Sequence, residues 1–457
     1  MRIEHDLLGE REIPSSVYWG IHTLRATENF RLSSTSVDLG LIRAISYVKK
    51  ACCQANNELG YIKDELASAI ESVCSEIIER KLDSQFPVDS LQGGAGTSTN
   101  MNVNEVIANR ALEILGKERS RYEFCHPIEH VNLHQSTNDV FPTALKIACI
   151  EGVRGLSKAA EGLQGVLQRK EKKFSSIITI GRTEMQEAVP IILGSQFSSF
   201  ADAISRDRWR TFKCEERLRV VNIGGTAVGT GLTAPRSYIF LVIEKLRQLT
   251  GYGLTRGENV MDQTANADVF VEVSGILSAQ ASNLVKICKD LRTLHFTGEI
   301  ALPAVQSGSS IMPGKVNPVI MEAVIGAGIK VNANHQIISQ CAGMGTLQIN
   351  EYLPLIGAAL LESIHLLISS NSMLVPHIEK IQAFPSKCEE YAHRSITLIT
   401  AFLPKIGYEK AESIVKEYTT TGRNNFREFL VEKLGLELVN KVLSPANLVA
   451  LGYRETN

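Results

Sequence analysis

The sequence predicts a mainly α-helical protein whose long helices form a central bundle. Two stretches without proline, residues 143–176 and 262–296, carry this prediction. Apolar residues recur in both at the i, i+3, i+4 spacing of one helix face. In the second stretch they are Val269, Phe270, Val273, Ile276, Leu277, Leu284, Ile287, Cys288 and Leu291. A helix over that stretch would be roughly 50 Å long, and helices of this length normally lie in bundles. Strand-like alternation is confined to short pieces.

The chain changes character twice, which predicts three consecutive domains. Residues 1–140 mix loops and helices, and residues 141–392 form the long helical body. From residue 393 the helices become short and amphipathic, and the segment Leu403-Pro404-Lys405-Ile406-Gly407 interrupts their pattern. We therefore expect an N-terminal domain of loops and helices (1–140), a central bundle domain (141–392) and a small C-terminal helical domain (393–457).

The composition is that of an ordinary globular protein and excludes several classes of partner. Apolar residues make up 44% and charged residues 21% of the 457 residues, and the formal net charge is -1. No overall field therefore attracts nucleic acid or an anionic membrane. No uninterrupted apolar run is long enough to span a bilayer, and the charged segment 1–10 lacks the apolar region of a secretory signal.

The cysteines indicate a reducing compartment. The chain has nine of them, scattered from Cys52 to Cys388, and none forms a C-x-x-C pair. An odd number at irregular spacing is typical of reduced, buried thiols and not of a disulfide framework. We expect a cytoplasmic protein.

Four segments are poor in bulky residues and rich in hydroxyls, amides and glycines. They are residues 93–102 (GGAGTSTNMN), 135–139 (QSTND), 181–186 (GRTEMQ) and 307–318 (SGSSIMPGKVNP). Hydroxyls, amides and free N–H groups at helix N-termini are the donors that a carboxylate needs. Each segment alone is also compatible with a turn and a helix cap, which is the simpler interpretation of residues 135–139. The fourth segment adds a lysine and an asparagine to two serines, a mixture that a linker does not need.

Residues 308–318 (GSSIMPGKVNP) resemble the signature of the aspartase/fumarase superfamily. Residues 18–26 (YWGIHTLRA) resemble the N-terminal motif of that family, and the first three polar segments resemble its other active-site segments in the same order. The resemblance covers nearly the whole chain, and a chance match to all motifs in order is not credible. It implies a three-domain, all-α fold, no cofactor, and a homotetramer whose sites are each built from three subunits.

The resemblance also implies a reaction, the anti elimination of an amine from an amino-acid-like substrate to give a trans unsaturated acid. Ser309 matches the general base, and Lys315 supplies charge beside it. A serine is a weak base, so donors, positive charge and exclusion of water must stabilise its oxyanion. The matches to substrate-binding residues are Thr97, Ser136, Thr137 and Ser310 for the carboxylate next to Cβ, Thr183, Lys315 and Asn317 for the second carboxylate, Asn138 for the amine, and Glu184 and Glu322 near the leaving group.

Three positions depart from the family pattern. Ala95 stands where fumarases usually carry serine, which favours amine over hydroxyl chemistry. Glu184 stands where fumarases carry histidine and aspartases carry histidine or glutamine, and Glu351 replaces a residue that is usually apolar. Adjacent carboxylates at Glu184 and Glu322 would repel each other unless a cation lay between them. A substrate ammonium or a quaternary ammonium would serve.

Several interpretations of the substrate stay open. L-Aspartate, giving fumarate and ammonia, leads because both carboxylate-binding sets are present. The alternative is a betaine such as ergothioneine, which an ergothionase converts to thiourocanate and trimethylamine, and Glu184 and Glu351 favour it. A fumarase, or a helical scaffold without catalysis like the lens crystallins of this superfamily, is a further alternative. Glu184 would lose its role if it paired with Arg182 or Lys315.

Metal chemistry and histidine catalysis are not part of the prediction. No group of His, Cys, Asp or Glu residues has the spacing of metal ligands. His126 and His134 are single histidines, which are more often structural than catalytic, and we expect neither to act in the reaction.

Overall fold

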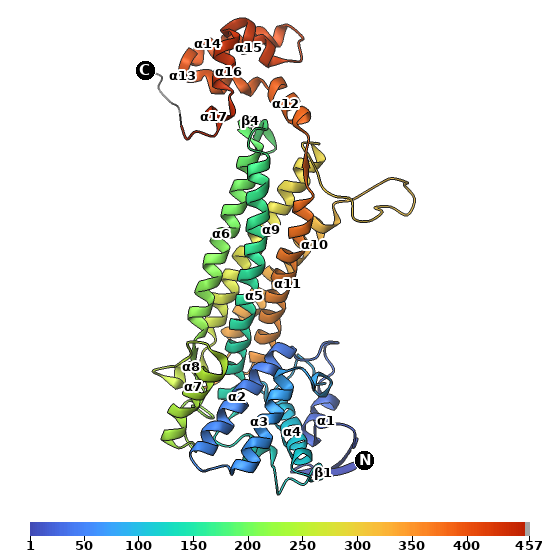
Figure 1. The fold of residues 1–457 in the computed structure, drawn as a ribbon, viewed down its shortest axis with the longest axis vertical. Helices are drawn as coiled ribbons and strands as arrows, with labels where there is room; N and C mark the ends of the chain where they lie inside the picture. Colours follow the sequence, from blue (N-terminus) through green and yellow to red (C-terminus); the bar gives the residue numbers. More distant parts are fainter. Residues whose placement is uncertain (453–457) are drawn as a thin grey trace. The chain divides into compact units, whose positions relative to one another are not determined.

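Five helices dominate the structure, a computed structural model that describes residues 1–452 (Figure 1). They are α5 (Thr137–Lys173), α6 (Leu193–Leu218), α9 (Asp268–Phe296), α10 (Val319–Ala342) and α11 (Leu353–Glu379). These elements confirm the predicted mainly α-helical class.

The chain divides into two compact units. Unit 1 comprises Met1–Ser157, Trp209–Ala279 and Ile329–Leu367, and unit 2 comprises Lys158–Arg208, Gln280–Gly328 and Ile368–Asn457. Each of the five long helices contributes residues to both units. The division of the sequence into three consecutive domains stays a prediction.

Unit 1 adds short elements to its share of the long helices. They are β1 (Arg2–Asp6), β2 (Gly9–Ile13), α1 (Ile21–Asn29), α2 (Leu39–Glu58), α3 (Asp64–Ile78), η1 (Asp83–Gln85), α4 (Thr97–Ile114), η2 (Pro127–Val131), β5 (Val220–Val221), α7 (Arg236–Thr250), β6 (Thr255–Arg256) and α8 (Val260–Ala265). The β1 and β2 strands pair antiparallel, and β5 and β6 pair parallel.

Unit 2 contains two further strand pairs and the C-terminal helices. Its elements are β3 (Ile178–Thr183), β4 (Gln186–Ile192), β7 (Ile300–Ala301), β8 (Gln382–Ala383), α12 (Pro385–Arg394), η3 (Ile396–Phe402), α13 (Leu403–Ile406), α14 (Tyr408–Thr420), α15 (Phe426–Leu434), α16 (Leu436–Val442) and α17 (Pro445–Leu448). The β3–β4 pair is a hairpin in which Thr183 lies opposite Gln186, and β7 pairs antiparallel with β8.

Glycines let the long helices approach closely within each unit. In unit 1, a Cβ on Gly152 of α5 would lie 2.8 Å from Cγ2 of Ile364 on α11. In unit 2, a Cβ on Gly328 of α10 would lie 2.5 Å from Cγ2 of Val285 on α9. Both distances are below van der Waals contact, so a side chain at either glycine would push the packed helices apart.

Helix α5 starts earlier than the proline-free stretch predicts, at Thr137, and contains Pro142. Proline has no N–H to donate to the carbonyl four residues before it, which here is that of Asn138. The side-chain amide of Asn222 donates to that carbonyl at 3.0 Å instead. The helix therefore continues through a proline because a distant residue satisfies the acceptor.

Helix α9 starts later than predicted. The pattern over residues 262–296 predicts one helix, but α8 ends at Ala265 and α9 begins at Asp268. Between them Asn266 is extended (φ -103°, ψ 146°), and its side-chain amide donates to the Asp262 carboxylate at 2.7 Å. Asparagine competes with the helical backbone in this way because its short amide reaches local groups.

The N-terminal motif is explained by the cap of α1. Glu105, only 2% exposed, accepts hydrogen bonds from the N–H groups of Gly20 (2.9 Å), His22 (2.8 Å) and Thr23 (3.1 Å). Glu4 accepts from the N–H of Ile21 at 2.8 Å. Two carboxylates thus satisfy the free N–H groups at the start of the helix, where its dipole favours negative charge.

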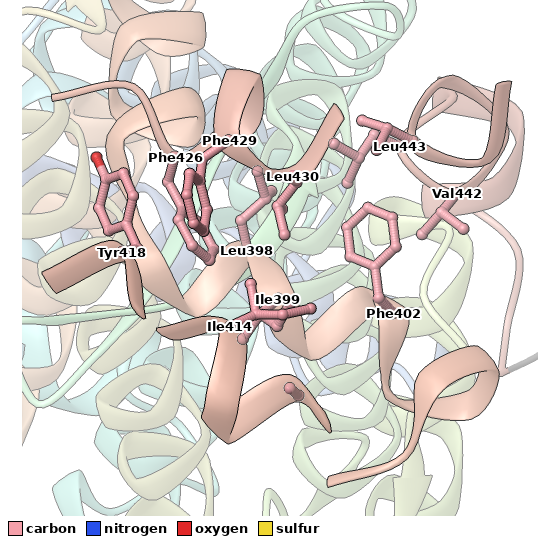
Figure 2. Close-up of a cluster of buried hydrophobic side chains, with 12 residues drawn as sticks. Leu398, Ile399, Phe402, Ile414, Tyr418, Phe426, Phe429, Leu430, Val442 and Leu443 are labelled. Atoms are coloured by element: carbon pink, nitrogen blue, oxygen red, sulfur yellow. The ribbon is translucent and has the colours of Figure 1, made fainter. Parts of the chain in front are cut away.

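The C-terminal helices of unit 2 have a hydrophobic core of their own (Figure 2). The Tyr418 ring lies edge-on to Phe426, with centroids 4.7 Å apart, and it also contacts Phe429 at 5.4 Å. The remaining labelled members are Leu398, Ile399, Phe402, Ile414, Leu430, Val442 and Leu443. Because these side chains come from η3, α14, α15, α16 and the residue that follows α16, they hold together short helices that would not be stable alone.

All nine cysteines lie within the described residues and are buried free thiols, which confirms the predicted thiol pattern.

Helix α11 is long and apolar enough by length and composition to cross a membrane, but 61% of its most apolar window is buried inside the fold. Polar residues such as Asn371 interrupt it, and such burial is typical of a core helix.

Candidate active site

The first polar segment leads into the N-terminus of α4. Gly94, Ala95 and Gly96 all have positive φ values, of 86°, 56° and 91°, and Thr97 is the first residue of the helix. A Cβ on Gly96 would lie 2.3 Å from Cδ2 of Phe141, so only glycine fits this position. The turn therefore places Thr97 at the helix end, where free N–H groups and the helix dipole favour an anion.

The second polar segment is the cap of α5, as its sequence alone suggests. Ser136 Oγ accepts from the N–H of Asn138 at 3.2 Å, and the Ser136 N–H donates to the Asp139 carboxylate at 2.9 Å. Asn100 of α4 donates its side-chain amide to Thr137 Oγ1 at 3.1 Å. This bond joins the starts of α4 and α5, so unit 1 brings Thr97, Ser136, Thr137 and Asn138 to two linked helix N-termini.

The side-chain NH₂ group of Asn138 is held by a hydrogen bond to the backbone. Its side-chain amide donates to the carbonyl of Ala227 at 2.7 Å. The adjacent Asp139 is fully buried and accepts from the N–H groups of Gly224 (3.1 Å) and Thr226 (2.9 Å). Burial raises the pKa of Asp139 to about 6, against the effect of these donors. The bonds fix the loop 224–227 against the start of α5.

The third segment is the tip of the β3–β4 hairpin. Glu184 and Met185 form its two-residue turn with φ values of 51° and 62°, and both are exposed. Positive φ at two residues other than glycine or asparagine is costly and is most often retained at functional sites. Glu184 has no ion-pair partner in the part of the chain that the structure describes, and Arg182, its suggested partner, is instead bound to Glu299.

Glu299 fixes the base of this hairpin. Its carboxylate is fully buried and accepts hydrogen bonds from Arg182 Nη1 (2.7 Å), Thr297 Oγ1 (2.6 Å) and the hydroxyl of Thr179. The Arg182 guanidinium also lies over the Tyr391 ring, 5.0 Å from its centroid. Arg182 immediately precedes Thr183, so these contacts determine where Thr183 and Glu184 are presented.

The fourth segment is a loop that links β7 to α10 and projects from the helices of unit 2 (Figure 1). It is closed at its base, because the Gly308 N–H donates to the Lys315 carbonyl at 2.7 Å and the Asn317 side chain donates to the Gly308 carbonyl at 2.9 Å. A Cβ on Gly308 would lie 2.8 Å from the Lys315 carbonyl oxygen. Glycine is therefore required for closure of this loop.

Within this loop two backbone groups are directed at the predicted base. Ser309 Oγ accepts from the N–H groups of Ile311 (3.2 Å) and Met312 (2.9 Å). Ser310 and Lys315 belong to the same loop and are exposed. N–H donors to a hydroxyl oxygen stabilise the ionised form over the neutral one, so the arrangement favours a serine oxyanion.

Glu322 and Glu351 are both engaged. Glu322, at the start of α10, forms an ion pair with Arg292 at 3.0 Å. Glu351 accepts the hydroxyl of Thr346, and this hydrogen bond lowers the pKa of Glu351. Glu322 therefore has a cation other than a substrate ammonium to neutralise it, and Glu351 closes the loop between α10 and α11.

The two histidines have structural contacts. His126 Nδ1 accepts from the N–H groups of Ile128 (3.0 Å) and Glu129 (3.2 Å) and caps the π-helical turn η2. His134 Nδ1 lies 2.7 Å from Oδ1 of Asn56, and burial lowers the pKa of His134. Among residues 1–452 no three His, Cys, Asp or Glu side chains come together as metal ligands would.

Sequence reasoning did not identify the polar network that joins the first two polar segments. Lys49 and Asn104, which are buried, and Asn132, which is partly buried, form hydrogen bonds with one another or with Asn100 and Gln135 of those segments. The signal was a lysine inside the apolar stripe of α2 and the high density of amides in residues 100–104 and 132–135. The partners are far apart in the sequence, so the pattern alone did not connect them.

The predicted site residues fall into two groups. Unit 1 holds Thr97, Ser136, Thr137 and Asn138, and unit 2 holds Thr183, Glu184, Ser309, Ser310, Lys315, Asn317 and Glu322. Each group contains residues that are predicted to bind a carboxylate, and only the second contains the predicted base.

Comparisons with known proteins agree over almost the full chain. A family described as lyase matches residues 9–332. The aspartate ammonia-lyase of Helicobacter pylori is 41% identical, with 98% of this chain and 98% of the relative covered. The fumarate lyase:delta crystallin of Brucella melitensis, bound to cobalt, superposes with a TM-score of 0.94 at 41% identity, covering 98% of this chain and 100% of that one. A class II fumarase from Schistosoma mansoni gives a TM-score of 0.91 at 31% identity, over 97% and 98%. This chain therefore belongs to the aspartase/fumarase superfamily of lyases, as its motifs suggested.

Proposed function

We propose that the protein is an aspartate ammonia-lyase, which converts L-aspartate to fumarate and ammonia. The observation that carries the proposal is the loop 308–317, whose backbone N–H groups point at Ser309 Oγ in a chain 41% identical to an aspartate ammonia-lyase over nearly its whole length. The comparisons give no support to a betaine as substrate, which was the alternative from the sequence. Glu184 remains the residue that would distinguish the two.

In the proposed mechanism Ser309, as an oxyanion, removes the proton from Cβ of aspartate. The electron pair of that C–H bond moves into the adjacent carboxylate, which takes up a second negative charge. Hydroxyls and N–H groups at Thr97, Ser136, Thr137 and Ser310 would stabilise this charge, because aligned donors act most strongly where charge develops. The electron pair then returns to form the Cα–Cβ double bond, and the Cα–N bond breaks on the opposite face.

The remaining roles concern orientation and the leaving group. Thr183, Lys315 and Asn317 would bind the second carboxylate, and Asn138 would lie at the amine. The Glu184 carboxylate, exposed and free of an ion pair among the described residues, would attract the substrate ammonium. Neither step needs a cofactor, because a carboxylate serves as the electron sink.

Assembly is part of the proposal. The family resemblance implies a homotetramer with sites shared between subunits, in which segments of three subunits would build each site. The nine buried free thiols support a cytoplasmic location, since such thiols persist in reducing compartments.

The central test is Ser309→Ala, with Ser307→Ala as a matched control in the same loop. General-base catalysis contributes about 10²–10⁴-fold, so Ser309→Ala should lower kcat by at least that factor while the circular dichroism spectrum and oligomeric state are unchanged. Ser307→Ala should remain close to wild type, because among residues 1–452 the Ser307 hydroxyl donates only to the Ser309 carbonyl, at 3.4 Å. Turnover is measured as fumarate absorbance and released ammonia. Near-normal turnover of Ser309→Ala would exclude this residue as the base.

Complementation tests the shared site. Ser309→Ala and Thr97→Ala, each inactive alone, should regain activity when unfolded together and refolded as a mixture, because some sites would then carry both wild-type residues. Full activity of a dilute monomer in sedimentation experiments would refute the assembly.

A further inference from the structure

Lys49 of α2 is a buried cation that the proposed reaction does not use. It is 1% exposed, and it forms no ion pair with any carboxylate of residues 1–452. Its ammonium donates instead to two amide oxygens, Asn132 Oδ1 at 2.7 Å and Gln135 Oε1 at 2.8 Å. Burying an ammonium that forms no ion pair costs several kcal/mol, and the attraction of the buried Asp139 carboxylate only partly offsets this cost, so stability alone gives no reason for a lysine here.

Asn132 is the centre of the network around Lys49. Its Oδ1 accepts from Lys49 Nζ and also from the side-chain amides of Asn100 (3.1 Å) and Asn104 (3.2 Å). Its own amide donates to the Gln135 carbonyl at 3.2 Å. Three donors at one oxygen leave Asn132 a single orientation, and the cation is the strongest of the three.

The network ends at a residue of the proposed site. The Asn100 amide that donates to Asn132 also donates to Thr137 Oγ1 at 3.1 Å. A hydroxyl that accepts a hydrogen bond in this direction keeps its own proton for another acceptor. Thr137 is the first residue of α5, so this proton is available at the helix end that faces the proposed substrate carboxylate.

We infer that Lys49 is a positioning residue, which orients the Thr137 hydroxyl toward a dicarboxylate through Asn132 and Asn100. The inference rests on the proposed function. Lys49 also holds Gln135 directly, the residue before the Ser136 cap, so a single cation fixes both the side chain and the backbone that precede Thr137. Burial lowers the pKa of Lys49 to about 7, so near neutral pH the side chain is partly an uncharged amine, which still has two N–H groups to donate to Asn132 and Gln135.

A second buried lysine in unit 1 provides the control. Lys146 of α5 is 2% exposed and donates to the Val220 carbonyl at 2.7 Å and to Gln263 Oε1 at 3.1 Å. It therefore matches Lys49 in burial and in number of hydrogen bonds. Its partners lead to β5 and α8 and not to Thr137, so loss of Lys146 should affect folding stability alone.

The experiment compares Lys49→Met with Lys146→Met in the full-length enzyme. We expect Lys49→Met to raise both KM for L-aspartate and the inhibition constant of succinate about tenfold, a change of about 1.4 kcal/mol in binding. Lys146→Met should leave both constants within about twofold of wild type. This should hold even if its unfolding midpoint falls as far as that of Lys49→Met. Equal constants in the two variants would overturn the inference.

Two further variants keep the test decisive. Asn100→Ala removes the direct link and should reproduce the shift if Lys49→Met does not fold. The effect of Thr137→Ala on the succinate constant should be smaller in the Lys49→Met background than in wild type, whereas additive effects would contradict a shared path. A wild-type protein that forms no fumarate from aspartate would refute the proposed function, while an active wild type with indistinguishable lysine variants would refute only the role of Lys49.

Discussion

The buried ion pair between Arg182 and Glu299 should determine both the stability of unit 2 and the presentation of Thr183. In Glu299→Gln the side chain keeps its size but loses its charge. In the native ion pair the Glu299 side chain is 0% exposed and the Arg182 side chain is 18% exposed. Removing one partner of a buried pair costs about 3–5 kcal/mol, because the other charge is left uncompensated.

The lower end of that range is expected for Glu299→Gln. The hydroxyls of Thr179 and Thr297 can rotate to accept from the new amide, and the remaining oxygen can still accept from Arg182. We therefore expect a loss of about 3 kcal/mol in the free energy of unfolding. Because Thr183 follows Arg182 directly, kcat/KM should fall about tenfold, the factor that corresponds to about 1.4 kcal/mol.

The matched control is Glu379→Gln, which removes an exposed pair with Arg169 in the same unit. The side chains of Arg169 and Glu379 are 59% and 48% exposed, and exposed pairs contribute about 0–1 kcal/mol. Urea unfolding followed by circular dichroism gives both free energies, and fumarate absorbance gives kcat/KM. If the two variants lost the same stability and kept wild-type kcat/KM, the assigned role of Glu299 would be wrong.

Three other perturbations have clear expected outcomes. Gly96→Ala combines positive φ with a clash at Phe141 and should destabilise the protein by about 2–4 kcal/mol in urea unfolding; an unchanged midpoint would contradict the contact. Glu184→Gln should preserve kcat/KM on aspartate, whose ammonium can still donate to an amide, but lower it on a betaine; equal ratios on every active substrate would remove Glu184 from the site. Burial lowers the pKa of Lys146 from 10.5 to about 8, so the contribution of this residue to stability should rise between these pH values, by up to about 1.4 kcal/mol per pH unit. Wild type should therefore gain stability relative to Lys146→Met over this range, while the contributions of Lys49 and of the buried thiols are common to both proteins; parallel curves would count against the shift.

The helical class and the polar segments could be predicted because they depend on local patterns. Apolar spacing over residues 262–296 indicated α9, and glycine and hydroxyl content marked the four segments that form turns, caps and loops in the structure. The predicted thiol state of the cysteines was also confirmed. These properties depend on residues that lie close to one another in the sequence.

The errors and omissions have a common physical cause, which is contact with residues distant in sequence. Pro142 suggested a helix boundary, but Asn222 satisfies the carbonyl that the proline leaves free. Lys49 and Glu299 were not predicted to matter, because the residues that they contact lie far away in the sequence. The roles of Ser309 and the substrate-binding residues stay predictions, since they depend on a bound substrate and on neighbouring subunits.

The closed base of the loop 308–317 has a consequence for its conformational entropy. Fixing the backbone of one residue costs about 1–2 kcal/mol of conformational entropy. Ordering a fully flexible loop of this length over the substrate would therefore be strongly unfavourable. The hydrogen bonds of Gly308 to Lys315 and Asn317 restrict the residues between them before a substrate arrives. If the loop moves as a closed unit on its two stems, Ser309 would move together with its N–H donors.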